Sequence, residues 1–299
     1  MYLTMRLGLG FQLKNLSNMK KEIIGVIGMG FVGNAVAKWF TNKQYTVRSY
    51  DKFKSFNSFE ETLDSDIMFL CLPTLFSTEL RGYDYSALHE TLEKLQNSNY
   101  EGTIVIKSTT QPKTIMNLHY LYSELNIVHN PEFLTARTSE EDFANQKHIV
   151  LGYTENEEQL GELKSLYKES FPDAEISTST STESELMKIF ANSFYAVKVQ
   201  FFNEMFDLCK KLDSDYSLVI SLMLKNGWIN PMHTTVPGPD GKLSYGGACF
   251  PKDTQALYGT MLENGSICEV LGATISERNK MRKNENTEHH RDETPVRQD

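Results

Sequence analysis

A cysteine, a lysine and an aspartate stand close together in the stretch 245–253, which reads Tyr-Gly-Gly-Ala-Cys-Phe-Pro-Lys-Asp. A thiolate is a strong nucleophile, and the neighbouring cation Lys252 should bias Cys249 toward that reactive form. The two glycines let backbone approach a ligand, and Asp253 adds a carboxylate four residues on. A buried small residue in a loop is the commoner use of cysteine, but the local glycines and charges favour a nucleophile here.

Four further positions could contribute polar groups to the same chemistry. Lys188 and Asn192 are four residues apart in a stretch of helical periodicity, so they share one helix face, although a solvated lysine and a surface asparagine fit the spacing equally. Glu132 follows a short apolar strand, where its carboxylate could act as a general base or complement a helix dipole. Thr109 follows another strand and could hydrogen-bond a ligand or cap the next element.

A glycine-rich turn joins the first apolar run to a helix-like stretch. In such a strand–turn–helix, one glycine makes the turn, one lets backbone approach a pyrophosphate, and one lets the helix pack on the strand. Asp51 ends the next apolar run, where an acidic side chain accepts hydrogen bonds from the ribose of NAD and repels the 2′-phosphate of NADP. The pattern predicts an NAD site, with glycines serving packing alone as the alternative. Its predicted residues are Gly28, Met29, Gly30, Phe31, Val32, Gly33 and Asp51.

Composition limits the classes of partner. The chain has 299 residues, of which 40% are hydrophobic and 23% charged, and a net charge of −9, which argues against duplex nucleic acid. No apolar run reaches the roughly 18 residues of a membrane span. The four cysteines lack metal-like spacing and should be free thiols in a reducing cytoplasm. We expect no metal site, because the His289-His290 pair is most simply solvated.

Elements of alternating type must position these residues. Strands and helices alternate over 23–152 and predict an α/β fold that begins with a Rossmann-type doubly wound parallel sheet. Ligands of such sheets bind at the carboxyl ends of the strands, so the turns there should face one crevice. These turns lie at Gly28, Asp51, Thr74, Thr109 and Glu132. Strands are expected at 23–27, 45–50, 66–72, 103–106, 126–129, 148–152 and 174–177.

A long helix should follow the sheet. Residues 183–212 contain neither Gly nor Pro and repeat apolar residues at helical spacing, with Thr182 as the expected N-cap. About 30 helical residues span ~45 Å, so this helix should join domains or dimerise. We expect a disordered extension (1–20), an NAD-binding domain (21–182), a small all-α domain (183–283) and a disordered tail (284–299). Other helices are expected at 83–96, 115–125, 155–168, 215–224, 255–263 and 268–283, with a loop over 226–253.

Taken together, these stretches resemble the nucleotide-sugar dehydrogenases, the family of UDP-glucose and GDP-mannose 6-dehydrogenases. The lysine–asparagine pair on the helix, combined with Gly-Gly-x-Cys-x-Pro-Lys-Asp, separates that family from the 6-phosphogluconate and 3-hydroxyacid dehydrogenases, which lack the cysteine. The matching pieces run in family order: Gly25–Gly33, Pro73-Thr74, Lys107–Thr109, Asn130–Leu134, Glu185–Glu204, Tyr245–Asp253 and Glu277–Arg282.

The resemblance implies two hydride transfers to NAD at one site. The C6 alcohol of a nucleotide sugar, most simply UDP-glucose, would become an aldehyde, add to Cys249 as a thiohemiacetal, and leave through a thioester as a carboxylate. Lys188 would stabilise the reacting oxygen, Glu132 would be the base, and Asn192, Asp253 and Thr109 would position water. The cofactor would also contact Thr74, Thr109 and Lys252. Substrate contacts would come from Glu132, Phe133, Leu134, Lys188, Asn192, Tyr245, Gly246 and Gly247.

Two departures from the family pattern keep other interpretations open. Family members often carry a second glutamate four residues after the first, where this chain has Ala136. The family's third domain, which grips the nucleotide base, is expected to be lacking. The alternatives are a truncated NAD-binding protein with little activity and a single-step hydroxyacid-type dehydrogenase. The resemblance also implies a homodimer formed through the 183–212 helix and a role in polysaccharide biosynthesis, with no nucleic-acid or membrane partner.

Overall fold

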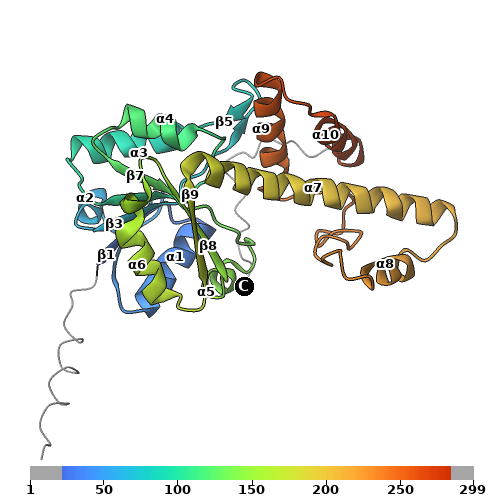
Figure 1. Ribbon diagram of the computed structural model, residues 1–299, viewed down its shortest axis with the longest axis horizontal. Helices are drawn as coiled ribbons and strands as arrows, with labels where there is room; N and C mark the ends of the chain where they lie inside the picture. Colours follow the sequence, from blue (N-terminus) through green and yellow to red (C-terminus); the bar gives the residue numbers. More distant parts are fainter. Residues whose placement is uncertain (1–21, 284–299) are drawn as a thin grey trace, which may run out of the picture.

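The computed structural model describes residues 22–283 as a helix-covered sheet joined by one long helix to a smaller group of helices (Figure 1). The expected extension 1–20 and tail 284–299, with its histidine pair, lie outside the described residues. Within 22–283, no helix is both long enough and apolar enough to cross a bilayer, and no cluster of His, Cys, Asp or Glu could hold a metal ion.

The first half is a seven-stranded sheet of order β2-β1-β3-β6-β7-β8-β9. The first five strands in this order are parallel, which confirms the predicted Rossmann-type sheet. Their final residues pair across neighbouring strands, so these carboxyl ends form one edge. The strands are β1 (Ile23–Ile27), β2 (Thr46–Tyr50), β3 (Ile67–Leu70), β6 (Thr103–Ile106), β7 (Asn126–His129), β8 (His148–Tyr153) and β9 (Glu175–Thr180).

The expectation of parallel strands throughout 23–152 needs one correction. Strand β8 runs antiparallel to β7, and β9 is parallel to β8. A parallel connection needs a crossover of a dozen or more residues, usually a full helix, whereas α5 (Ser139–Ala144) has only six residues and packs against α1. The chain therefore re-enters the sheet from the edge at which β7 ends, and the start of β8 joins that edge.

Helices cover both faces of the sheet (Figure 1). The first face packs against α1 (Phe31–Asn42), α5 and α6 (Gly161–Ser170). The opposite face packs against α3 (Ser86–Asn97) and α4 (Thr114–Leu121). Strands buried on both faces read as continuous apolar runs, which is why they could be found in the sequence. The minor elements are α2 (Phe59–Thr62) and the 3₁₀ turn η1 (Glu157–Leu160).

The long helix α7 (Ser181–Lys211) leaves the sheet directly after β9. Its N-cap is Thr180, whose backbone N–H donates to the Glu183 carboxylate at 2.9 Å while its hydroxyl accepts from the Glu183 N–H at 3.3 Å. The expected cap, Thr182, is wrong, because pairing with β8 extends β9 to Thr180. The helix has 31 residues, close to the expected length.

A buried carboxylate fixes this helix to the sheet half. Glu185 accepts hydrogen bonds from the Thr110 hydroxyl (2.9 Å) and from the N–H groups of Lys113 (2.8 Å) and Ile115 (2.9 Å). Its side chain is fully buried, and burial raises its pKa to about 7. These hydrogen bonds hold the start of α7, one turn before Lys188, against the loop that follows β6.

The second half contains α8 (Tyr216–Leu224), α9 (Phe250–Glu263) and α10 (Glu269–Met281). Helix α9 starts five residues earlier than expected, with Pro251 in its first turn, so Cys249 lies at its N-cap instead of inside a loop. A short hairpin, β4 (Phe76–Ser77) and β5 (Gly82–Tyr83), was not expected. It extends from the sheet half onto α9 and so connects the two halves.

Candidate active site

The three glycines of the first turn have three different surroundings. Gly28 has φ +92°, and a Cβ there would lie 2.5 Å from the carbonyl oxygen of Cys71. A Cβ at Gly33 would lie 2.0 Å from the carbonyl oxygen of Gly28, so this glycine lets α1 pack on the turn. A Cβ at Gly30 would meet no atom within 4 Å. Only Gly30 therefore borders open space, as a glycine that admits a pyrophosphate must.

The start of α1 is suited to hold phosphate. Gly30 is its N-cap, no side chain caps it, and no acidic residue lies in its first turn, so its N–H groups and dipole favour an anion. The Asp51 carboxylate accepts from the backbone N–H groups of Met29 (2.8 Å) and Phe53 (2.9 Å), which ties the end of β2 to the turn. A carboxylate has about four acceptor positions, so Asp51 retains capacity for ribose hydroxyls. These residues fit NAD.

Thr74 and Thr109 lie at the next two strand ends. The Thr74 hydroxyl donates to the carbonyl oxygen of Thr109 at 2.8 Å, and the Ser108 hydroxyl donates to the carbonyl oxygen of Leu72 at 2.7 Å. These two hydrogen bonds hold the loops after β3 and β6 together, at the same edge of the sheet as the glycine turn. Both threonines lie where the sequence predicted them, between the glycine turn and Glu132.

The polar side chains of α7 meet residues from both halves of the chain. The Lys188 ammonium lies 3.6 Å from the Glu132 carboxylate and 4.9 Å from the centre of the Phe133 ring. One turn further along, the Asn192 side-chain amide donates to the Asp253 carboxylate at 2.6 Å. All four polar side chains of these pairs are buried. The alternative of a solvated lysine and a surface asparagine is excluded by this burial.

Cys249 lies among these charged groups. Burial raises the pKa of its thiol, and the nearby carboxylates of Asp253 and Glu132 raise it further, while the ammonium groups of Lys252 and Lys188 lower it. Lys252 thus acts in the expected direction, but burial outweighs it, so the net shift favours the neutral thiol over the thiolate. The Lys252 ammonium is also paired with the Asp253 carboxylate at 2.6 Å. The N-terminus of α9 remains a local source of positive potential for a developing thiolate.

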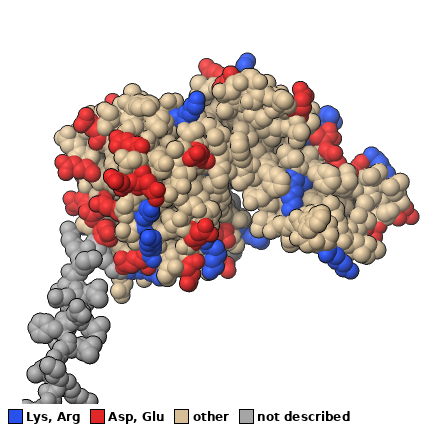
Figure 2. All heavy atoms as spheres, viewed as in Figure 1, with Lys and Arg blue, Asp and Glu red and all other residues tan. Residues whose placement is uncertain are grey.

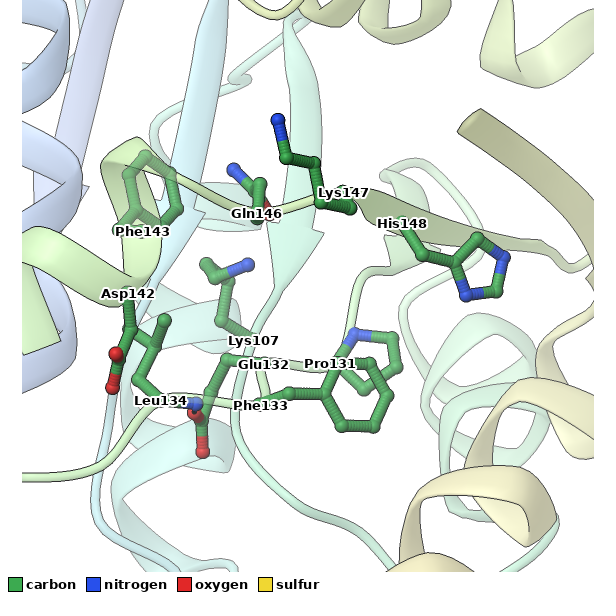
Figure 3. Close-up of a pocket in the computed structure, with 10 residues that line it drawn as sticks. All are labelled: Lys107, Pro131, Glu132, Phe133, Leu134, Asp142, Phe143, Gln146, Lys147 and His148. Carbon is green, nitrogen blue, oxygen red and sulfur yellow. Dashed lines mark hydrogen bonds between the residues drawn. The ribbon is translucent and has the colours of Figure 1, made fainter. Parts of the chain in front are cut away.

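A small pocket of about 200 Å³ lies behind Glu132, between the loop after β7 and the start of β8 (Figure 3). The reversal of β8 brings Lys147 and His148 to its rim. Lys107 also lines it; burial lowers the pKa of that lysine to about 8, and its ammonium donates to the side-chain and backbone oxygens of Asn130 at 2.8 and 3.1 Å. Lys107 belongs to one of the stretches that resemble the family, but its position in the sequence did not indicate a buried amine beside the predicted base.

The predicted substrate contacts differ in accessibility. Phe133 is exposed, whereas the Leu134 N–H already donates to the Glu132 carboxylate. The Tyr245 side chain is buried beneath Arg278, so only the backbone at Gly246 and Gly247 approaches the surface. The loop is held by Arg282, which donates to the carbonyl oxygens at 243 and 244, and a Cβ at Gly246 would lie 2.4 Å from that guanidinium.

One residue that contacts this site was missed entirely. The Tyr83 hydroxyl donates to Asp253, and its ring lies 4.4 Å from the Lys252 ammonium. Tyr83 is separated from Asp253 by 170 residues, and β5 is only two residues long. No periodic pattern in the sequence could have indicated this contact.

Comparison with known proteins gives two adjoining matches. The NAD binding domain of the UDP-glucose/GDP-mannose dehydrogenase family matches residues 46–171, and the central domain of that family matches residues 182–280. A UDP-glucose 6-dehydrogenase from Rickettsia prowazekii (strain Madrid E) is 34% identical over 245 residues, which are 78% of this chain and 53% of that protein. Another UDP-glucose 6-dehydrogenase, from Rhizobium meliloti (strain 1021), is 30% identical over 71% of this chain and 49% of that protein.

The chain thus spans about half the length of the curated relatives it matches. Among solved structures, a UDP-glucose dehydrogenase from the archaeon Pyrobaculum islandicum superposes with a TM-score of 0.79 at 24% identity, covering 90% of this chain and 70% of the other. A 3-hydroxyisobutyrate dehydrogenase from Mycobacterium tuberculosis superposes with a TM-score of 0.71 at 17% identity, covering 88% of this chain and 94% of the other. At these identities the superpositions establish the fold alone.

Proposed function

Since the chain belongs to the UDP-glucose/GDP-mannose dehydrogenase family, whose two domain matches cover most of its length, we propose that it is an NAD-dependent nucleotide-sugar dehydrogenase. We propose a two-step oxidation of the sugar C6 alcohol to a carboxylate, with UDP-glucose as substrate and UDP-glucuronate as product. The observation that carries this proposal is that four charged side chains affect the pKa of the same thiol, that of Cys249. They are Lys188, Glu132, Lys252 and Asp253.

The first oxidation needs a base and an electrostatic partner for the oxygen. When bound, NAD accepts a hydride in each of the two oxidations. The Glu132 carboxylate takes the hydroxyl proton of the alcohol, and the Lys188 ammonium, 3.6 Å from that carboxylate, stabilises the negative charge that develops on the oxygen. The product of this step is the aldehyde.

The second oxidation uses the thiol. The sulfur of Cys249 bonds to the aldehyde carbon, the thiol proton passes to the aldehyde oxygen, and a thiohemiacetal results. Loss of a hydride and of the hydroxyl proton then gives a thioester. Because burial raises the pKa of Cys249, the thiol needs help from its surroundings, and the start of α9 together with Lys188 supplies positive potential at the reacting atoms.

Hydrolysis completes the reaction. Water attacks the thioester carbon, the carbon–sulfur bond breaks, the carboxylate leaves and the thiol is restored. We assign the positioning of this water to Asn192 and Asp253, whose side chains are joined at 2.6 Å, and to Thr109 after β6. The proposed cofactor contacts are the glycine turn, Asp51, Thr74, Thr109 and Lys252. The proposed sugar-nucleotide contacts are the backbone of Phe133 and Leu134 and the loop from Tyr245 to Gly247.

We also propose that the protein forms a homodimer through α7. Large apolar side chains are exposed along one stripe of this helix, among them Phe194 (62%) and Leu212 (66%). The stripe runs from residue 190 to the C-cap at 212, ~33 Å along the helix axis, which suits a second copy of the helix better than solvent. Its exposed members are Phe190, Phe194, Phe201, Leu208 and Leu212.

Two further assignments complete the proposal. Acidic side chains are spread over the sheet half in the view of Figure 2, which fits a partner that is neither nucleic acid nor an anionic membrane surface. The cysteines within residues 22–283 are free thiols, which fits a cytoplasmic setting. We divide the chain into an NAD-binding domain to residue 182 and a helical domain from 183, and we assign the uronic acid product to polysaccharide biosynthesis.

The test is the stoichiometry of NADH formation with the purified chain. UDP-glucose, UDP-N-acetylmannosamine and GDP-mannose are supplied in turn with NAD, and NADH and remaining sugar are measured together. The proposal predicts two NADH per UDP-glucose consumed. One NADH per molecule would support the single-step alternative, and NAD binding without turnover would support an NAD-binding protein of little activity.

A further inference from the structure

Tyr83 lies at the junction of the two halves. It belongs to the β4–β5 hairpin of the sheet half, and its side chain is 2% exposed where the hairpin packs on α9. Burial and the nearby Asp253 carboxylate raise the pKa of its phenol well above the usual range. Both effects favour the protonated phenol, the form that donates a hydrogen bond.

The two ends of this side chain contact two different site residues. The hydroxyl donates to one oxygen of Asp253, which also lies 2.6 Å from the Lys252 ammonium. The other oxygen of Asp253 accepts from Asn192 at 2.6 Å. The face of the Tyr83 ring lies 4.4 Å from the Lys252 ammonium, within the range of a cation–π interaction. The Asp253 carboxylate is fully buried, so these three side chains fix its orientation.

We propose that Tyr83 is a positioning residue with two separable tasks: its hydroxyl orients Asp253 for thioester hydrolysis, and its ring holds Lys252 beside the cofactor. This inference rests on the two-step oxidation proposed above. It joins a residue of the β4–β5 hairpin to Asn192 on α7 and to Lys252 and Asp253 on α9.

The hydroxyl task follows from geometry. A hydrolytic water must be held within a few tenths of an ångström of its attack position, and the residues that hold it must themselves be fixed. Without the hydroxyl, Asp253 keeps Asn192 and Lys252 as partners but loses its fixed donor from the hairpin. Hydrolysis should then slow, while the two oxidations continue.

The ring task follows from the surroundings of Lys252. An ammonium on a flexible four-carbon stem needs a second contact besides the carboxylate to stay in one place. The aromatic face supplies it without competing for the lysine's hydrogen-bond donors. Removing the ring should therefore weaken NAD binding, whereas removing the hydroxyl alone should not.

The experiment compares Tyr83→Phe, Tyr83→Leu and the control Tyr85→Phe. Tyr85 is a neighbouring tyrosine whose hydroxyl accepts from the Gln111 N–H and contacts no site residue, and its ring lies 6.1 Å from that of Tyr83. Rapid mixing with UDP-glucose and NAD should give, for Tyr83→Phe, a burst approaching two NADH per chain and then a steady rate about tenfold below wild type. Calorimetry should give an unchanged dissociation constant for NAD.

Tyr83→Leu should show the same burst and, in addition, an NAD dissociation constant raised at least threefold by calorimetry. Its Cys249 should also react more slowly with iodoacetamide, because Lys252 lowers the pKa of that thiol only while it is held nearby. The Tyr85→Phe control should match wild type in all three assays.

A Tyr83→Phe chain with wild-type steady-state rate and no burst would overturn the hydroxyl task. Wild-type NAD affinity in Tyr83→Leu would overturn the ring task. If the wild-type chain makes no NADH, the proposed function and the hydroxyl task fail together, and calorimetry and alkylation still decide the ring task.

Discussion

Two glycines of the first turn, only three residues apart, should respond to the same substitution in opposite ways. A methyl group at Gly33 would lie 2.0 Å from the carbonyl oxygen of Gly28, far inside contact distance, so backbone must move. Overpacking of this kind typically costs 1–3 kcal/mol. At about 2 kcal/mol, and ~2–4 °C per kcal/mol for a domain of this size, Gly33→Ala should lower Tm by ~4–8 °C.

Gly30→Ala should leave the fold intact and impair the cofactor site. Gly30 has φ −76°, which any residue adopts, and its Cβ would meet no atom within 4 Å, so Tm should change by no more than ~2 °C. The same methyl group would occupy the space through which a pyrophosphate approaches the start of α1. NAD affinity should fall at least tenfold, or about 1.4 kcal/mol.

The assays are NAD calorimetry and thermal melting of both variants and wild type. The reasoning is refuted if Gly30→Ala binds NAD as tightly as wild type, because the open side of the turn then does not face the phosphates. It is refuted equally if Gly33→Ala melts at the wild-type temperature, because the close approach of α1 to the turn would then be absent in solution.

Three further substitutions test the buried Glu185 carboxylate, the exposed apolar stripe of α7, and the preference for NAD over NADP. The pKa of Glu185 is about 7 in the folded protein against an ordinary 4.5. Between these two pH values the folded state keeps a proton that the unfolded state has lost. The stability that this group contributes therefore falls as pH rises from 4.5 to 7, by up to about 3 kcal/mol. Urea unfolding of Glu185→Gln should therefore show stability relative to wild type increasing from pH 4.5 to 7, and a constant difference would contradict the assignment. Phe194→Glu should convert a dimer to a monomer in light scattering, whereas Tyr120→Glu, on α4 and still more exposed, should not. Unchanged mass in both variants would exclude the α7 stripe as the interface. Asp51→Asn removes a negative charge near the ribose and should narrow the preference for NAD over NADP about five- to tenfold, and an unchanged ratio of the two dissociation constants would show that Asp51 does not select the cofactor.

The local patterns of the chain were sufficient to predict most of the sheet and the glycine turn. Strands buried on both faces carry uninterrupted apolar runs, and each glycine of the turn has the surroundings that its spacing implied. The stretch 183–212 lacks helix breakers, so α7 could be predicted in length. Its cap was misplaced because a run of serines and threonines offers several equivalent caps, and only pairing with β8 selects Thr180.

The parts that could not be predicted depend on contacts between distant residues. Helix α9 begins inside a stretch rich in glycine and proline, where local propensity favours a loop, and this start places Cys249 at a helix N-terminus. The pKa of that thiol depends on burial, which spacing does not encode. Tyr83 reaches Asp253 across 170 residues of sequence. The sequence was thus sufficient to predict candidate residues for the site, but not how burial and neighbouring charges shift their pKa values.

The most direct test of the central claim is to look for the acyl group on the sulfur. A chain carrying Asn192→Ala, which should slow hydrolysis, is mixed with UDP-glucose and excess NAD, quenched in acid and examined by peptide mass spectrometry, with Asn192→Ala/Cys249→Ser as control. We predict a uronyl adduct on the peptide containing Cys249 in most chains, removable by hydroxylamine and absent from the control. NADH formation without any adduct at Cys249, or an adduct that persists in the control, would contradict the account.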